Sequence, residues 1–366
     1  MRIACLPYGC CMTTLSSCVV SQIQTTLTVT NKGGIMKTVL KAIALSLPLC
    51  VALAAEAPPD QRAAMAAMFA RQAALPDTPG TGRFPAMKEE VATLPDHVVY
   101  RPARLDKLGS TRLGLYIFGN GGCSNDGASA RLHLLEIASH GYLAVAPGRL
   151  RSGPGATVPR PATPPAPAPG AAQGGPPAGL PPPATSSADL VASLDWALAQ
   201  NDDPNSPYHH KIDPKAVAVS GYSCGGLQAL EIAKDPRIKT VVIMNSGIFN
   251  AGTGPAIAGM NQSKSLLETL HTPTLYILGG ETDIAYANGT DDFKRIDKVP
   301  VFLGNILNVG HGGTYWDPNG GKAAAAVVAW LDWQLRNDQK AAKTFVGKNC
   351  GLCTDPAWSV AKKKID

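Results

Sequence analysis

The sequence predicts an α/β domain with a mostly parallel central sheet covered by helices on both faces. From about residue 97 onward, short apolar segments rich in β-branched residues alternate with helix-like segments, as is typical of parallel sheets. The apolar segments are continuous runs rather than alternating patterns, which indicates strands buried on both faces. With 45% hydrophobic and only 16% charged residues, the chain can fill a large core.

Seven segments have the composition and length of buried strands. They span residues 97–102, 113–119, 142–148, 216–221, 240–246, 274–280 and 299–307. Helices are predicted between them, near residues 127–139, 186–200, 225–234, 261–270 and 285–296. A closing helix is predicted over 321–336, where the apolar residues recur near a 3.6-residue period: Ala324, Val327, Val328, Leu331 and Leu335.

The N-terminal residues have the pattern of an export signal that begins at Met36. Lys37 and Lys41 precede a short apolar run, and the small-x-small site at residues 52–54 predicts cleavage after Ala54. The run is too short to span a bilayer, so no stable membrane span is expected in the mature form. We therefore expect a signal peptide at 36–54, a periplasmic or secreted protein, and a non-native upstream extension at 1–35.

The mature chain is predicted to hold one main domain. Residues 55–96 form an N-terminal segment with a helix over 58–75, and residues 97–366 form the domain itself. Residues 152–187 are rich in Pro, Gly and Ala, a composition that cannot maintain a helix or a sheet ladder. Because the strand–helix alternation resumes afterwards, we interpret this segment as an insert within the domain.

The net charge gives no indication of a nucleic-acid partner. The chain has 33 basic and 27 acidic residues, but Arg2, Lys32, Lys37 and Lys41 precede the predicted cleavage site and no acidic residue does. Their removal leaves 29 basic residues against 27 acidic ones. This near balance argues against binding to nucleic acid or to an anionic membrane.

The Gly-Tyr-Ser-Cys-Gly stretch at residues 221–225 is the clearest candidate for chemistry. The Gly-x-Ser-x-Gly string alone is weakly specific, but here a predicted strand precedes it and a predicted helix follows it. This context is what a nucleophilic serine on a sharp strand-to-helix turn requires. We predict that Ser223 is a nucleophile.

A nucleophilic serine needs a base and an orienting carboxylate, and parallel sheets place sites at the carboxyl ends of their strands. Of the seven histidines, His311 alone follows a predicted strand. The loop after the strand 274–280 offers Glu281 and Asp283, of which Asp283 has more room to turn inward. The sequence therefore predicts a triad of Ser223, Asp283 and His311.

Acyl transfer also needs two backbone N–H groups that stabilise one developing oxyanion. One is expected from Cys224, and the other from Gly122 or Cys123 in the glycine-rich loop at 118–127. A phosphate-binding role for that loop is disfavoured, because it lacks the third glycine of the dinucleotide fingerprint and no lysine follows.

After the predicted cleavage, four of the nine cysteines remain: Cys123, Cys224, Cys350 and Cys353. Four cysteines allow three possible disulfide pairings. Two oxyanion donors must lie within about 6 Å of each other, so a Cys123–Cys224 disulfide is one hypothesis; two buried thiols are the alternative. A zinc site at Cys350-x-x-Cys353 is disfavoured, because the two further ligands that zinc needs are missing. A redox motif is disfavoured as well, because such a motif lies at a helix start after a strand, whereas this pair follows the last predicted helix. A local structural disulfide is favoured.

The quoted motifs resemble those of the α/β-hydrolase superfamily over roughly residues 95–337. The stretches "GYSCGG", "GNGGCS", "GGETD" and "GHGG" correspond to its nucleophile, oxyanion, acid and histidine loops. The stretch "EIASHGYLAVAPG" is similar to dienelactone-hydrolase-like, chlorophyllase-like and polyester-hydrolase-like members.

The resemblance implies an α/β-hydrolase fold and a serine esterase that acts on a small-molecule or polymeric ester, without a metal or organic cofactor. Tyr222, Asn120, Tyr315 and Trp316 are candidates for the substrate cleft, with packing or loop shaping as their alternative roles. A serine peptidase, an acyltransferase or a non-catalytic binding protein on the same scaffold is the alternative function. The oligomeric state is left open.

Overall fold

The computed structural model describes residues 70–159, 183–250, 252–253 and 260–366. The predicted extension at 1–35, the signal peptide at 36–54 and the middle of the Pro-rich insert lie outside these residues. Most of the helix predicted over 58–75 also lies outside them, and its described part is helical at residues 70–74.

The described residues contain one nine-stranded sheet with the order β1-β2-β4-β3-β5-β6-β7-β8-β9. The strands are β1 (Ala86–Val91), β2 (Leu94–Pro102), β3 (Leu113–Gly119), β4 (Tyr142–Pro147), β5 (Ile212–Tyr222), β6 (Thr240–Met244), β7 (Thr274–Leu278), β8 (Val301–Ile306) and β9 (Trp358–Lys363). Strands β4, β3, β5, β6, β7 and β8 pair in parallel. Strands β1, β2 and β9 pair antiparallel at the two edges. The predicted α/β class with a mostly parallel sheet is confirmed.

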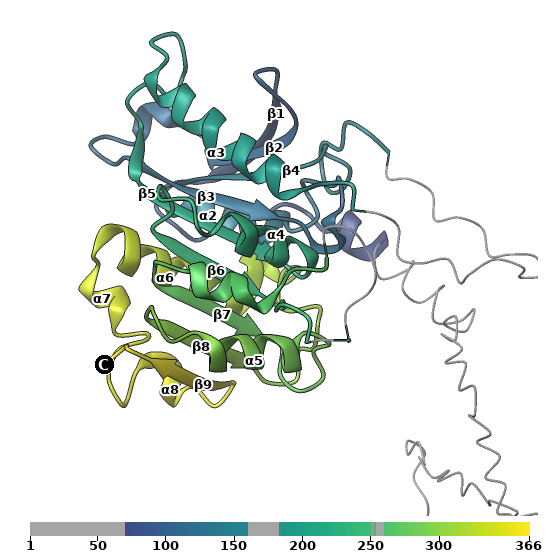
Figure 1. Ribbon diagram of the computed structural model, residues 1–366. Coiled ribbons are helices and arrows are strands. Elements are labelled where there is room, and N and C mark those ends of the chain that lie inside the picture. The colour runs from purple at the N-terminus through teal and green to yellow at the C-terminus, as the bar shows by residue number, and fades with distance from the viewer. Residues whose placement is uncertain (1–69, 160–182, 251, 254–259) are drawn as a thin grey trace, which may run out of the picture. The chain divides into compact units, whose positions relative to one another are not determined.

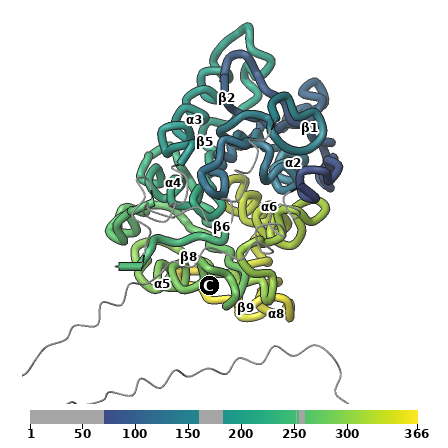
Figure 2. The backbone as a smooth tube through the Cα atoms, turned by 90° about the vertical axis from the view of Figure 1, so that its right-hand side faces the viewer, coloured from purple at the N-terminus to yellow at the C-terminus, as the bar shows by residue number. Residues whose placement is uncertain are grey.

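Helices cover both faces of this sheet. The longer ones are α2 (Arg131–Ser139), α3 (Ser187–Asp202), α4 (Cys224–Ile232), α5 (Tyr286–Arg295) and α6 (Gly321–Arg336), and the short ones are α7 (Gln339–Ala342) and α8 (Gly351–Thr354). Figures 1 and 2 show α3, α4 and α5 on one face and α2 and α6 on the other. In the described part of the chain, no helix is long and apolar enough to cross a membrane.

The parallel strands alternate their side chains between two hydrophobic cores. In β3, Leu115 and Ile117 pack in the core beneath α3 and α4, whereas Tyr116 and Phe118 pack in the core beneath α2 and α6. Both sets are fully or almost fully buried. Burial on both faces explains why these strands are continuous apolar runs in the sequence.

Several elements of the structure differ from the sequence-based expectation. The edge strands β1 and β9 were not expected, because most of their residues are half-exposed and neither is an apolar run. Strand β1 carries one lysine and two glutamates, and β9 ends in two lysines. Residues 264–269 form a 3₁₀ helix instead of an α-helix over 261–270. The helix expected from residue 127 begins at Arg131, after a loop that contributes to the candidate site.

The topology places the loops of interest at one edge of the sheet. Ser223 follows β5, Asp283 follows β7 and His311 follows β8, and these three strands are parallel members of the same sheet. The carboxyl ends of parallel strands meet at a common edge, so the three side chains can converge although they lie far apart in sequence.

Candidate active site

Ser223 occupies a strained turn between β5 and α4. Its backbone adopts φ 53° and ψ −122°, a region that costs a non-glycine residue about 1–3 kcal/mol. Its N–H donates to Met244 O at 3.0 Å, and its carbonyl accepts from Gly226 N at 2.9 Å and Ser246 Oγ at 2.6 Å. These three hydrogen bonds hold the turn in a conformation that the chain would otherwise avoid.

Glycines permit the close packing beneath this serine. A Cβ atom built on Gly225 would lie 2.1 Å from the carbonyl of Gly119, at the end of β3. A Cβ on Gly221 would lie 2.1 Å from the Gly225 carbonyl. The serine turn and the loop after β3 can therefore approach each other only because these positions lack side chains.

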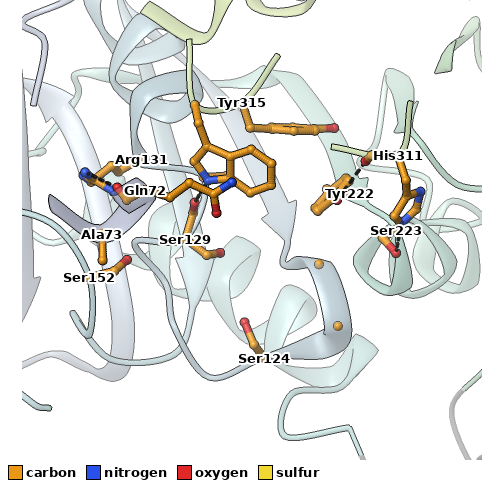
Figure 3. A pocket seen from close by; sticks show the side chains of 14 residues that line it. Gln72, Ala73, Ser124, Ser129, Arg131, Ser152, Tyr222, Ser223, His311 and Tyr315 are labelled. Carbon is orange, nitrogen blue, oxygen red and sulfur yellow. Dashed lines mark hydrogen bonds between the residues drawn. The ribbon is translucent and has the colours of Figure 1, made fainter. Parts of the chain in front are cut away.

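The structure brings the three predicted triad residues into one hydrogen-bonded chain. Ser223 Oγ lies 2.9 Å from His311 Nε2, and His311 Nδ1 lies 2.7 Å from Asp283 Oδ1. Figure 3 shows the Ser223 hydroxyl and the His311 ring in contact at one end of a pocket. This connectivity is that of a nucleophile, a base and an orienting carboxylate.

Asp283 is buried, with 3% of its surface exposed, and its carboxylate is fully paired. Oδ1 accepts from Ala285 N at 2.9 Å as well as from His311, and Oδ2 accepts from Gly279 N at 2.9 Å and Asn245 Nδ2 at 2.8 Å. Burial acts to raise the pKa of this carboxyl, but these hydrogen bonds outweigh it and hold the pKa below its ordinary value. Asp283 is thus kept ionised beside the imidazole.

Asn245 is a site residue that sequence reasoning missed. It follows β6 with φ 43°, and its amide donates both to Asp283 and to Gly310 O, the latter at 3.2 Å. Tyr315 Oη lies 3.4 Å from Asn245 Oδ1. The only available signal was its place at the end of the predicted strand 240–246, the same criterion that identified the acid and the histidine.

The glycine-rich loop after β3 is tied to the serine turn by a disulfide. Cys123 and Cys224 are bonded with their Cα atoms 5.3 Å apart, across 101 residues of sequence. The Cys123 N–H donates to Asn120 O at 3.1 Å, whereas in the described part of the chain no acceptor is found for the Gly122 N–H. Of the two loop amides that the sequence left open, that of Gly122 is therefore the free one.

A cleft of about 320 Å³ contains Ser223 and His311 in its wall. The expected aromatic residues Tyr222, Tyr315 and Trp316 also line it, and the rings of Tyr222 and Tyr315 lie 4.4 Å apart. Tyr222 Oη additionally donates to the His311 carbonyl at 2.9 Å. These aromatic side chains form one side of the cleft and contact the histidine loop.

Asn120 does not line the cleft as expected. Its side chain is fully buried, and its amide donates to Ser124 O at 2.9 Å and to Pro147 O at 2.6 Å. It therefore shapes the glycine-rich loop, which is the alternative role that the sequence allowed.

The second cysteine pair lies in the C-terminal tail. Cys350 and Cys353 are bonded with their Cα atoms 4.9 Å apart, around the start of α8. This matches the expected local disulfide. Among the described residues, no group of three or more His, Cys, Asp and Glu side chains is arranged to hold a metal ion.

The chain was compared with models of protein families and with curated proteins, and neither comparison finds a match.

Proposed function

We propose that this chain is a serine ester hydrolase of the α/β-hydrolase type. The observation that carries the proposal is the continuous chain from Ser223 through His311 to Asp283, set in the wall of a cleft. The order serine, acid, histidine along the sequence is the order found in α/β-hydrolases. The serine turn between β5 and α4, after a run of parallel strands, supports the same fold type.

In the proposed reaction, Ser223 Oγ attacks the ester carbonyl while His311 Nε2 takes its proton. The ionised Asp283 carboxylate, bonded to Nδ1, orients the ring and stabilises the imidazolium that forms. The imidazolium then protonates the departing alkoxide, and an acyl-Ser223 intermediate is left. A water molecule, deprotonated by His311, attacks the acyl carbon and releases the acid and the free serine.

The tetrahedral intermediates need two N–H donors, and we assign these to Cys224 and Gly122. Cys224 is the first residue of α4, so its N–H has no partner within the helix and lies at the positive end of the helix dipole. Gly122 lies in the loop after β3 and has a free N–H among the described residues. The Cys123–Cys224 disulfide links the two segments that carry these donors.

The proposed enzyme would be an exported protein. Two disulfides in the described residues fit an oxidising compartment better than a reducing one. Together with the signal-like sequence from Met36, this supports a periplasmic or secreted enzyme.

Steady-state hydrolysis of p-nitrophenyl esters from acetate to decanoate would test the proposed activity. The protein should hydrolyse at least part of this series, and Ser223→Ala should lower kcat/KM by about 10⁴-fold or more. Ser265→Ala, which alters an exposed serine outside the cleft, is the matched control and should retain full activity. Equal activity in Ser223→Ala and the control would refute the proposal.

A further inference from the structure

The cleft extends from the triad to a second group of polar residues. In Figure 3, Gln72, Ser129 and Ser152 gather at the end opposite Ser223 and His311. These residues come from three separate segments: the helical turn at 70–74, the loop before α2, and the loop after β4. No motif in the sequence groups these residues, and none of them belongs to the triad.

Arg131 holds the segment that carries Gln72 in place. Its side chain is 1% exposed, and its Nη2 donates to Gln72 O at 3.0 Å and to Leu75 O. Its Nε donates to Asp77 Oδ1 at 3.0 Å, and the same carboxylate also pairs with Lys88. The N-terminal segment is thereby fixed as a wall of the cleft by a buried, charge-assisted network.

Ser152 provides the observation that points to a ligand. The residue is 4% exposed and lines the cleft, yet its hydroxyl has no hydrogen-bond partner within the described residues. A buried hydroxyl without a partner is unfavourable, so such groups are normally satisfied by a protein group, by water or by a ligand. In Figure 3, the Ser152 hydroxyl and the Gln72 amide both point toward the interior of the cleft.

We propose that Gln72 and Ser152 form a polar subsite that recognises a hydrogen-bonding group at the end of the substrate remote from the scissile ester. This inference rests on the proposed ester hydrolysis. The aromatic side chains of Tyr222, Tyr315 and Trp316 contact the apolar middle of the substrate, and the subsite binds a terminal hydroxyl or carbonyl oxygen. Arg131 is a positioning residue, since it acts through the Gln72 segment.

The subsite should create a preference for esters that end in a polar group. Hydrogen-bonding sites discriminate against analogues that lack the bonding group, because their own polar atoms are then left unpaired. One such bond has a net value of about 1 kcal/mol, which corresponds to roughly a fivefold change in kcat/KM. Most of this change should appear in KM, because the subsite is remote from the reacting atoms.

The test compares matched ester pairs that differ only in a terminal hydroxyl. One pair is p-nitrophenyl octanoate and ω-hydroxyoctanoate, and the other is octyl acetate and ω-hydroxyoctyl acetate, so that both the acyl and the alcohol portions are probed. The ratio of kcat/KM for the hydroxylated ester to that for the plain ester is measured for the full-length protein. It is then measured for Ser152→Ala, for Gln72→Met and for the control Ser265→Ala.

In at least one pair, we expect the ratio to fall about fivefold in Ser152→Ala and in Gln72→Met, and to stay unchanged in Ser265→Ala. Because Gln72 is half-exposed, its substitution should not disturb folding, so a change in Gln72→Met reports loss of the subsite rather than misfolding. Ratios that stay unchanged in both variants, with ester hydrolysis intact, would overturn the subsite alone. Absence of any Ser223-dependent hydrolysis would instead overturn the proposed function, and the subsite with it.

Discussion

The two ends of the cleft differ in how completely their polar atoms are paired within the protein. At the triad end, each carboxylate oxygen of Asp283 accepts two hydrogen bonds, and His311 uses both ring nitrogens. At the other end, the buried hydroxyl of Ser152 has no partner among the described residues. In the proposed enzyme, the triad end would be organised before the substrate binds, whereas the other end would be completed by the substrate.

This difference has an energetic consequence. A preorganised group stabilises a transition state without further rearrangement, so its removal should cost several kcal/mol in activation free energy. A group that only contacts a remote part of the substrate should cost about 1 kcal/mol. Substitutions of the triad residues themselves should therefore have effects that exceed the fivefold change expected at the subsite by orders of magnitude.

After Ser223→Ala, the largest effect is expected from Asp283→Asn. The amide keeps the shape of the side chain but removes the charge that stabilises the imidazolium, so kcat should fall by about 10³–10⁴-fold. KM should change little, because Asp283 is buried behind the histidine. The kinetic constants for p-nitrophenyl esters would measure both quantities, and a loss of less than tenfold would argue against a triad.

The Cys123–Cys224 disulfide should contribute most to the stability of the triad end. It closes a loop of 101 residues, and the chain-entropy estimate for such a loop is about 4–5 kcal/mol of unfolding free energy. The same estimate for Cys350–Cys353, only three residues apart, is about 1–2 kcal/mol.

Two double Cys→Ser variants, one for each disulfide, can separate the contributions of the two disulfides to stability and activity. Urea unfolding should show the larger loss of stability for the Cys123/Cys224 variant, and only this variant should also lose ester hydrolysis below the unfolding transition. Equal stability losses in the two variants, or unchanged hydrolysis without the first disulfide, would contradict its role in holding the oxyanion donors.

His133, which packs beside the aromatic side chains of the cleft, should make the stability of the folded protein sensitive to acid. It is fully buried against Tyr315, and burial lowers its pKa to about 3. The unfolded chain binds a proton here below about pH 6.5, but the folded protein does not until about pH 3, so stability falls as the pH falls between these values. The full loss is on the order of 5 kcal/mol.

The variant His133→Gln cannot take up this proton. Its free energy of unfolding should therefore depend less on pH between 6.5 and 3 than that of the wild type. Urea titrations at a series of pH values would measure the two slopes. Parallel slopes would show that His133 is not held neutral in the fold.

A smaller effect is expected from Asn245→Ala. The substitution removes the donor to Asp283 Oδ2 and the contact with Gly310 O, so the histidine loop loses part of its support. The loss of one bond to a charged group corresponds to about 1.5–3 kcal/mol, or roughly a tenfold to hundredfold decrease in kcat. Asn205→Ala, at an exposed loop position, serves as the control and should leave kcat unchanged. A kcat equal to that of the control would exclude a positioning role for Asn245.

The sequence was informative where burial or strand-end position determined the residue types. The parallel strands were recognisable because residues such as Leu115 and Tyr116 face two different cores. Ser223, Asp283 and His311 could be selected because each follows a strand whose carboxyl end lies at the same sheet edge.

Other parts depend on contacts that no local pattern encodes. The strands β1 and β9 lie at sheet edges and have mixed polar sequences, so their pairing partners determine their structure. Ser152 lies at the start of a Pro- and Gly-rich segment, and Gln72 lies in the N-terminal segment. That the N-terminal segment forms a wall of the cleft becomes evident only from its hydrogen bond with the buried side chain of Arg131.

Peptide mass spectrometry can locate the adduct of a fluorophosphonate probe and thereby determine whether Ser223 is an activated nucleophile. These probes react with activated serine nucleophiles, so a single adduct should appear on Ser223 in the peptide that contains residues 216–233. Labelling should be lost in Ser223→Ala and strongly slowed in His311→Ala. Absence of an adduct on Ser223 in the folded protein, or equally fast labelling without His311, would show that Ser223 is not a nucleophile activated by His311.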